Sequence, residues 1–342
     1  MKNFGSSVVL VAGGAGFIGS HFIRRVLAHH PQTRIVNFDK LTYCGNRENL
    51  RDVAGDPRYE FIKGDIADGT ALDHAFQKYQ PRFVINFAAA THVDRSIHDG
   101  AAEFIHTNVV GVHTFLDVIR VRGGVEKFVQ GSSDEVYGDL PLGSATRFDE
   151  DSPLRPSSPY AASKAAGDLL CRAYFRTYGT PVVVTRATNN YGSHQYPEKL
   201  IPFFIMRAVA GDTLPLYGDG KHVRDWLFVE DHCAALETIL MQGRPGTVYN
   251  IGAGTERSNR EIAAQILRQF GAPRSRVAFM LDRPGHDRRY ALDASKIRRE
   301  LGWRPSAVFE EELVKTIQWY RDNQQWMARI LKRVKKINPH IA

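Results

Sequence analysis

The chain has 342 residues, of which 43% are apolar, and a formal net charge of +8. This length exceeds one compact core, and the apolar content can bury two, so we expect a larger and a smaller globular domain rather than a disordered chain. No apolar run is long enough to span a membrane, so the sequence predicts no membrane partner.

The charge and the cysteines limit the function further. The basic residues are spread through the chain without a nucleic-acid-binding motif, so they indicate solvated helix faces and attraction of a small anionic substrate rather than nucleic acid. Cys44, Cys171 and Cys233 are odd in number, far apart and without a CxxC spacing, which argues against a disulfide framework and a zinc site. We therefore expect a cytoplasmic protein without a metal.

Short apolar runs alternate with amphipathic helical patterns through the first half of the chain. The runs typical of strands are residues 8–11, 34–38, 59–62, 83–87, 127–130 and 182–185. The helical patterns between them include residues 19–28, 69–78 and 108–121. This alternation predicts an α/β fold with a Rossmann-type, doubly wound parallel sheet. After residue 187, loops rich in glycine, proline and aromatic residues indicate a smaller α/β substrate domain.

The glycine-rich segment 13–19 directly follows the first predicted strand and opens a helix. Glycines there allow a tight turn and a close approach of the backbone to a pyrophosphate at the helix N-terminus. Asp39 ends the next strand, where a carboxylate accepts ribose hydroxyls and repels a 2′-phosphate, so NAD is favoured, although Lys40 leaves NADP open. Asp65 either flanks the adenine or forms an ordinary strand-end turn.

Tyr160 and Lys164 are four residues apart and share one face of a predicted helix. The ammonium group of Lys164 can hold the phenol near the nicotinamide ribose. Because a tyrosine ordinarily titrates near 10, far above neutral pH, we expect this positive charge to lower the pKa of Tyr160 and allow it to act as a base.

Ser133, Asp134 and Glu135 place a hydroxyl and two adjacent carboxyl groups after the fifth strand. Hydride transfer from an alcohol needs only one base, so the additional acid and base indicate an elimination. Such chemistry needs environments that push the two carboxyl pKa values apart. The alternative for the pair is a solvated turn, and Tyr137 beside it either packs or contacts the substrate.

The sequence resembles the extended short-chain dehydrogenases/reductases, and within them the nucleoside-diphosphate-glucose 4,6-dehydratases, most of all the dTDP-glucose enzymes. The acidic pair Asp134 and Glu135 is the discriminating feature, since relatives that epimerise C4 usually carry small residues there. The resemblance extends through residues 301–303. The segments that carry it are residues 13–19, 39–43, 86–96, 133–138, 160–164, 189–192, 196–202, 217–220, 223–226 and 282–287.

The resemblance implies dTDP-glucose 4,6-dehydratase chemistry with bound NAD. Tyr160, supported by Lys164, would take the C4 hydroxyl proton while the C4 hydride passes to NAD⁺, and Ser133 would hold that hydroxyl. Glu135 would then remove the C5 proton, and a protonated Asp134 would donate to the leaving C6 hydroxyl. Return of the hydride to C6 would give dTDP-4-keto-6-deoxyglucose and water with NAD⁺ regenerated.

The same resemblance implies the binding residues. The cofactor set is Gly13, Gly16, Phe17, Ile18, Gly19, Asp39, Lys40, Leu41, Thr42, Asp65, Ile66, Phe87, Ala88, Ala89, Thr107, Tyr160, Lys164 and Asn190. The substrate set is Thr91, Ser133, Asn189, Asn190, Glu198, Lys199, Leu200, Pro215, Tyr217, Arg224, Asn259, Arg283 and His286. Arg224 is the strongest of these on chemistry alone, because a guanidinium fork fits diphosphate oxygens.

The change in composition after residue 187 predicts a domain division, and the resemblance implies a homodimer. Residues 1–186 would bind NAD, with 225–251 returning to that domain. Residues 187–224 and 252–330 would bind the nucleotide sugar, and 331–342 would form a basic tail. The helical segments 102–121 and 164–178 are the candidates for pairing two subunits.

Four residues depart from the family pattern. Ala12 and Ser133 stand where threonine is usual, Ala90 where glutamate is usual, and Thr91 where serine is usual. Thr91 and Ser133 keep a hydroxyl, so the hydrogen bonding they would provide survives. Ala90 removes a charge near the expected nicotinamide and sugar, which leaves the sugar and the rate open.

Three alternatives remain open at the level of the sequence. One is a dehydratase for a UDP-linked or N-acetylated sugar, because one methyl group in a pocket changes discrimination by only about 1–3 kcal/mol. A second is a C4 epimerase or oxidase for a related nucleotide sugar. A third is a catalytically silent NAD-binding regulatory protein, against which the intact Tyr160, Lys164, Asp134 and Glu135 argue.

Overall fold

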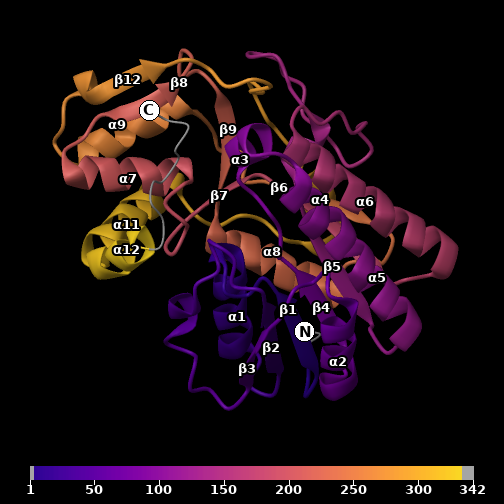
Figure 1. The fold of residues 1–342 in the computed structure, drawn as a ribbon. Coiled ribbons are helices and arrows are strands. Elements are labelled where there is room, and N and C mark those ends of the chain that lie inside the picture. Colours follow the sequence, from indigo (N-terminus) through magenta and orange to yellow (C-terminus); the bar gives the residue numbers. More distant parts are fainter. Residues whose placement is uncertain (1–3, 333–342) are drawn as a thin grey trace.

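A seven-stranded parallel sheet forms the centre of the larger part of the molecule (Figure 1). The structure is a computed structural model that describes residues 4–332. The strand order is β10-β6-β5-β4-β1-β2-β3, so the direction of succession reverses between β1 and β4. In such sheets the ligand crevice lies at the carboxyl ends of the strands at this reversal. The strands are β1 (Val8–Ala12), β2 (Arg34–Asp39), β3 (Tyr59–Lys63), β4 (Phe83–Asn86), β5 (Lys127–Ser133), β6 (Val182–Ala187) and β10 (Val248–Ile251).

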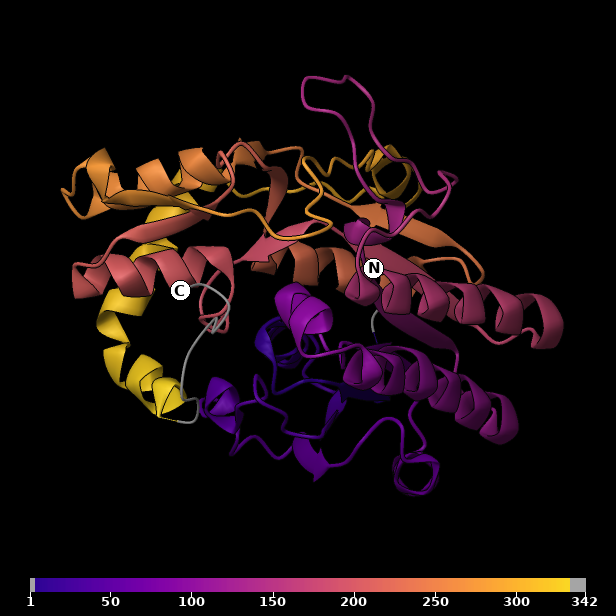
Figure 2. The same cartoon turned by 45° about the horizontal axis from the view of Figure 1, so that its top comes forward.

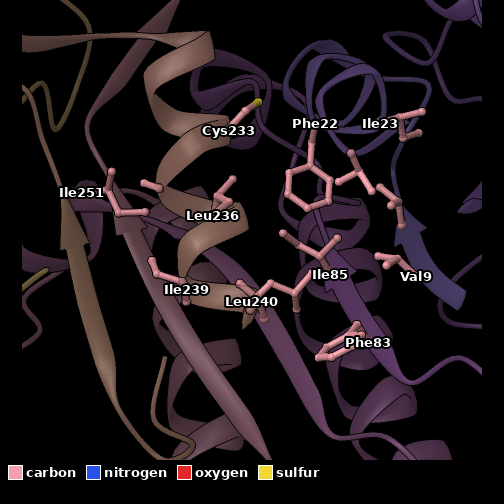
Figure 3. Close-up of a cluster of buried hydrophobic side chains, with 14 of the residues drawn as sticks. Val9, Phe22, Ile23, Phe83, Ile85, Cys233, Leu236, Ile239, Leu240 and Ile251 are labelled. Carbon is pink, nitrogen blue, oxygen red and sulfur yellow. The ribbon is translucent and has the colours of Figure 1, made fainter. Parts of the chain in front are cut away.

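Helices cover both faces of this sheet. One face is packed by α1 (Phe17–His29) and α8 (Val229–Gln242), and the other by α2 (Gly69–Tyr79), α5 (Gly111–Arg122) and α6 (Pro159–Tyr178). Figure 3 shows part of the first core, in which Leu236 and Leu240 of α8 lie with Ile85 of β4 and Phe22 of α1. All four side chains are fully buried. The strands read as continuous apolar runs because both of their faces are covered.

The smaller part is built from two short sheets and a separate hydrophobic core that includes Phe204, Trp226 and Ile317 (Figures 1 and 2). The three-stranded sheet has the order β11 (Glu256–Ser258), β9 (Val223–Phe228), β7 (Asn189–Tyr191), and the two-stranded sheet pairs β12 (Val277–Met280) with β8 (Leu214–Tyr217). The surrounding helices are α7 (Leu200–Ala210), α9 (Asn259–Gln269), α11 (Phe309–Asp322) and α12 (Gln324–Leu331).

The structure contains each strand and helix predicted for the first half, with one helix differing in form. The strand ends and the helices at α1 and α2 agree with the prediction within three residues. The helix predicted at 108–121 is longer and interrupted: α4 (Ala102–Ile105) and a π-helical turn (His106–Val110) precede α5. Asn108 lies in that turn, where its side chain accepts a hydrogen bond from Ala90 N at 3.0 Å, a tertiary contact that hydrophobic periodicity does not encode.

Within residues 225–251 the chain returns to the large sheet. β10 pairs with β6, and α8 packs on the sheet, and both lie within 225–251. α10 (Ser295–Leu301) contacts this same side of the sheet through Ile297. The domain boundaries themselves stay a prediction. The basic tail predicted at 331–342 lies outside the described residues from position 333 onward. Among residues 4–332, no helix combines the length and the apolar character needed to cross a bilayer.

Candidate active site

A cavity of about 340 Å³ opens at the carboxyl edge of the large sheet, where the strand order reverses between β1 and β4. Its walls come from the turn after β1, the ends of β2, β4 and β5, the start of α6, and residues 195–201 of the smaller part. This volume lies within the range of small-molecule sites. The cavity is continuous from the glycine-rich turn to the acidic pair after β5, so one ligand or two adjoining ligands can occupy it.

The glycine-rich turn fits the phosphates of a dinucleotide. Gly13 has φ +72°, and a Cβ there would lie 2.5 Å from the backbone nitrogen of Ala88. Only glycine is compatible with both the conformation and the space. The carboxylate of Asp39 accepts hydrogen bonds from Ala15 N at 2.9 Å and Leu41 N at 2.7 Å, which ties the end of β2 to this turn. Burial raises the pKa of Asp39 against these two bonds.

Both proposed roles of Asp65 have support in the geometry. Its carboxylate accepts a hydrogen bond from Ala67 N at 3.0 Å, as a strand-end turn requires. The same side chain lines the cavity and forms an ion pair with Lys40 Nζ at 2.6 Å. Lys40 is thereby engaged by a carboxylate at the cofactor end of the cavity.

The end of β5 places the hydroxyl of Ser133 and the carboxyl groups of Asp134 and Glu135 in the cavity. Ser133 is the last residue of β5 and caps the short 3₁₀ helix Asp134–Tyr137, since its Oγ accepts a hydrogen bond from Glu135 N at 3.2 Å. The Ser133 hydroxyl also donates to Asp134 Oδ1 at 3.2 Å. A cap of this kind fixes the direction of the turn and therefore of both carboxyl groups.

The two carboxyl groups have different surroundings. Burial, reinforced by the charge of Glu135, raises the pKa of Asp134 to about 8, so Asp134 is mostly protonated at neutral pH. Burial also raises the pKa of Glu135, but the nearby cations Arg283, Arg224 and Lys199 oppose that rise. The solvated turn considered from the sequence is excluded, because Asp134 is only 2% exposed. A proton donor and a proton acceptor can therefore stand side by side.

Tyr160 and Lys164 lie on the first two turns of α6, which begins at the capping residue Ser158. Both are buried, and Lys164 Nζ donates a hydrogen bond to Gly131 O at 2.6 Å. Burial, followed by the charge of Glu135, raises the pKa of Tyr160 well above its ordinary value, while the Ser133 hydroxyl acts to lower it. Desolvation of the phenolate therefore sets the direction of this shift in the protein alone. The expected effect of Lys164 on the pKa of Tyr160 stays a prediction.

A second group of residues lies beside Glu135 on the side of the smaller part. Asp94 of α3 (Val93–His98) accepts hydrogen bonds from Arg283 Nη1 at 2.8 Å and from the Tyr217 hydroxyl at 3.0 Å. Burial acts to raise the pKa of Asp94, but the Arg283 guanidinium outweighs it, and the pKa is lowered. Asp94 thus links the side of the cavity that the large sheet forms to Arg283 and Tyr217, which are predicted to bind the nucleotide.

The cavity collects most of the predicted site residues. From the cofactor set it is lined by Gly13, Gly16, Phe17, Ile18, Gly19, Asp39, Lys40, Thr42, Asp65, Ile66, Phe87, Ala88, Ala89, Thr107, Tyr160, Lys164 and Asn190. From the catalytic and substrate sets it is lined by Thr91, Ser133, Asp134, Glu135, Asn189, Asn190, Glu198, Lys199 and Leu200. Leu41 borders an adjoining depression instead. The predicted substrate residues outside the lining are Pro215, Tyr217, Arg224, Asn259, Arg283 and His286.

The region around Tyr217 holds the one group of potential metal ligands found among residues 4–332: His222, Asp282 and His286. The two imidazole rings are stacked, with centroids 3.6 Å apart and planes at 13°. The lone pair of an imidazole nitrogen lies in the plane of its ring, so two nearly parallel stacked rings do not converge on one ion. His286 instead meets the ring of Tyr217 edge-on, with centroids 5.8 Å apart.

Comparison with known proteins agrees with this geometry. The family model described as GDP-mannose 4,6 dehydratase matches residues 10–316. The dTDP-glucose 4,6-dehydratase of Xanthomonas campestris pv. campestris (strain B100) is 48% identical, over 94% of this chain and 95% of the relative. The chain belongs to this dehydratase family, a branch of the extended short-chain dehydrogenases/reductases.

Solved structures within and near the family have the same fold. The dTDP-glucose 4,6-dehydratase of Streptomyces venezuelae, crystallised with NAD and TYD bound, superposes with a TM-score of 0.91 at 48% identity, covering 94% of this chain and 99% of that one. The UDP-glucose 4-epimerase of Thermus thermophilus, in complex with NAD, has a TM-score of 0.84 at 33% identity, covering 92% and 99%. The fold is therefore common to dehydratases and epimerases, and the site residues must distinguish them.

The predicted sets for this dehydratase-family site lack several residues that make polar contacts there, among them Tyr43, Asp94, Asn108 and His232. The Tyr43 hydroxyl donates to Glu198 Oε1 at 2.9 Å, and His232 Nδ1 lies 2.9 Å from Asn190 Oδ1. Asp94 and Asn108 act as described above. Tyr43 and Asp94 fall within segments that carry the family resemblance, which could have identified them. Asn108 and His232 have no such signal.

Three of the residues that depart from the family pattern, Ala90, Thr91 and Ser133, make contacts within the site. Ala90 is buried and packs with Phe104 against the ring of Tyr160. Thr91 contributes its carbonyl, which accepts a hydrogen bond from Lys199 Nζ at 2.9 Å. Ser133 keeps the hydroxyl that caps the acidic turn. Where the family usually has a glutamate, Ala90 therefore gives the ring of Tyr160 an apolar neighbour.

Asp134→Asn should stabilise the fold, and more strongly at pH 8 than at pH 5. The folded pKa of about 8 exceeds the ordinary value of 3.8, so folding takes up a proton between these values and wild-type stability falls as the pH rises through this window. Asparagine has no proton to lose. Thermal unfolding of both proteins across this pH range is the measurement. The exposed Asp151→Asn should show no such trend, and a pH-independent difference for Asp134→Asn would contradict the assignment.

Proposed function

We propose that the protein is an NAD-dependent dTDP-glucose 4,6-dehydratase, which converts dTDP-glucose to dTDP-4-keto-6-deoxyglucose and water. The observation that carries the proposal is the unequal pair of carboxyl groups, the buried Asp134 and the partly buried Glu135, in one cavity with Tyr160 and Lys164. An alcohol oxidation alone has no use for this pair.

The chain's own residues suit NAD. The turn at Gly13 leaves no space for a side chain beside Ala88, and the N-terminus of α1, which follows the turn, can face the phosphates. Asp39 at the end of β2 is placed for the ribose hydroxyls and disfavours a 2′-phosphate. When bound, NAD supplies a reversible two-electron acceptor and a cationic ring at the end of the cavity that holds Lys164.

The proton transfers of the proposed reaction are assigned to four side chains. Tyr160 takes the proton of the C4 hydroxyl, which Ser133 orients. Because burial raises the pKa of Tyr160, this step requires the positive charges of Lys164 and of bound NAD to lower that pKa. With a ketone at C4 the adjacent C5 proton is acidic, and Glu135 removes it. Asp134, protonated at neutral pH, donates to the departing C6 hydroxyl, which leaves as water. The C5 proton is restored as C6 is reduced, so the product has lost one water and no net redox change occurs.

The nucleotide end of the substrate is proposed to bind along the smaller part. Arg283 and Arg224 carry positive charge next to Glu135, which suits a diphosphate attached to the reacting sugar. Tyr217 is held by Asp94 at the same place, where an aromatic ring can contact the base. The choice between thymine and uracil stays part of the proposal.

A C4 epimerase is the second candidate, because the Thermus thermophilus UDP-glucose 4-epimerase shares the fold at 33% identity. An epimerase removes and returns hydride at one carbon, so a proton donor with a pKa of about 8 beside a second carboxyl group has no step to serve. The acidic pair therefore favours the dehydratase.

Glu135→Gln should lower kcat for water loss by about 10²–10⁴-fold, because the amide cannot remove the C5 proton, while NAD binding is retained. Mass spectrometry of the sugar nucleotide after incubation with dTDP-glucose, UDP-glucose or their N-acetyl analogues is the measurement, without added reductant. Wild type should yield a product lighter by one water from dTDP-glucose. The exposed Glu126→Gln is the matched control with wild-type turnover. An isobaric product would identify the epimerase instead.

We also propose a cytoplasmic homodimer. All three cysteines are free, as a reducing compartment requires. The helices α5 and α6 lie side by side (Figure 2). They expose Val121, Leu169 and Tyr178, a pattern suited to pairing with a second copy.

Leu169→Arg should convert a two-chain particle into a single chain, because a guanidinium at a 56% exposed apolar position cannot be buried in an apolar contact. Sedimentation equilibrium at micromolar concentration measures the mass. The matched control is Val209→Arg on α7, 42% exposed, which should keep the two-chain mass. A wild-type protein that sediments as one chain would remove the dimer.

A further inference from the structure

A hydrogen bond links the cofactor side of the cavity to the smaller part and is used by no step above. The Tyr43 hydroxyl donates to Glu198 Oε1 at 2.9 Å, although the two residues are 155 positions apart. Tyr43 lies in the loop after β2, and Glu198 lies just before α7. Both residues line the cavity. The bond therefore joins the two walls that are predicted to bind NAD and the nucleotide sugar.

Residues 39–46, the cofactor loop, are hydrogen-bonded to the glycine-rich turn at both ends. Asp39 accepts a hydrogen bond from Ala15 N at 2.9 Å, and Asn46 N donates to Ala15 O at 3.0 Å. Between these ends Leu41 has φ +57°, a left-handed conformation that a leucine adopts only where its surroundings hold it. The shape of the loop, and with it the position of its tyrosine, therefore depends on what packs against it.

The side chain of Tyr43 is held on both faces and at its edge. The Arg95 guanidinium lies over the ring, 4.4 Å from its centroid, and the ring of Tyr196 meets it edge-on with centroids 5.3 Å apart. Burial, followed by the charge of Glu198, raises the pKa of Tyr43 well above its ordinary value, so the hydroxyl keeps its proton. The phenol is thus the donor and the carboxylate the acceptor.

Glu198 and Lys199, both predicted to bind the substrate, form the other side of this contact. The Glu198 side chain is 5% exposed, and its Oε1 lies 3.6 Å from Lys199 Nζ. Lys199 Nζ also donates to Thr91 O at 2.9 Å, and Lys199 is the residue that precedes α7. Because a carboxylate this deeply buried needs donors around it, the Tyr43 hydroxyl helps to set where Glu198 stands.

We propose that Tyr43 is a positioning residue that couples the binding of NAD to the binding of a nucleoside-diphosphate sugar. A cofactor loop packed against NAD through Asp39 and Thr42 holds the phenol in place, and the phenol holds Glu198. In return, a nucleotide that engages Glu198 and Lys199 favours the same arrangement and tightens NAD binding, chiefly by slowing its release. The nucleotide half of this coupling rests on the proposed function.

The direct test is the release of NAD from the full-length holoenzyme. NAD labelled with deuterium on the nicotinamide ring is added in excess, without nucleotide, with dTDP or with UDP. The labelled fraction of the bound NAD is then measured by mass spectrometry after gel filtration. In wild type, at least one nucleotide should slow the release by about 5-fold or more. Tyr43→Phe keeps the ring and removes the donor, so the same nucleotide should slow the release by about twofold or less.

Tyr137→Phe and Tyr249→Phe are the matched controls, because each removes a hydroxyl from the larger part and leaves the cofactor loop intact. The Tyr137 hydroxyl donates to Asn250 Oδ1 at 2.8 Å, and the Tyr249 hydroxyl donates to Glu300 Oε2 at 3.1 Å. Tyr137 is 1% exposed and absent from the cavity lining, which answers the question left by the sequence in favour of packing. Both variants should lower the thermal midpoint yet keep the wild-type effect of the nucleotide on NAD release.

An equal effect of the nucleotide in wild type and in Tyr43→Phe would overturn the proposal, as would its loss in both controls. So would NAD release from wild type that responds to neither nucleotide, a result that needs no variant to fold. These readouts need no turnover. If dTDP-glucose loses no water while a nucleotide slows NAD release only where the Tyr43 hydroxyl is present, the proposed function is rejected and this inference stands.

Discussion

The parallel register at β5 is the constraint on which the rest of the site depends. β5 pairs with β4 through Asn86 and Gln130, and with β6 through Ser133 and Ala187. This pairing brings the end of β5 to the same edge as the glycine-rich turn after β1. Ser133 then caps a tight turn that carries Asp134 and Glu135 into the cavity. A slip of one residue would turn the alternate side chains to the opposite face of the sheet, so the packing of the strands also fixes the chemistry.

Desolvation and nearby cations make two adjacent carboxyl groups unequal. In water both would be ionised at neutral pH, and neither could serve as an acid. In the cavity, desolvation raises both pKa values. Arg224 opposes the rise for both groups, whereas Arg283 and Lys199 act on Glu135, and Asp134 retains a pKa of about 8. Arg283, which is proposed to bind the nucleotide, therefore also helps to separate the proposed acid from the proposed base.

Much of the fold and the cofactor end of the site could be predicted because the signals are local. The glycine turn, Asp39 at a strand end, and the four-residue spacing of Tyr160 and Lys164 are each readable within a few residues. The long-range contacts could not be read in this way. Asp94 meets Arg283 across 189 positions, and Asp168 meets Arg186 only because α6 packs on β6. The raised pKa of Tyr160 could not be predicted either, because the cost of burying a phenolate depends on all the residues around it, which the spacing of Tyr160 and Lys164 does not reveal.

In the proposed reaction, oxidation at C4 and loss of water at C6 occur in one cavity without exchange of reducing equivalents with solvent. The most direct measurement is the fate of deuterium in dTDP-glucose labelled at C4, followed by NMR of the product. We expect the deuterium at C6 of dTDP-4-keto-6-deoxyglucose, with no reduced cofactor released. Deuterium back at C4 of an isomeric sugar, or lost from the sugar altogether, would contradict it.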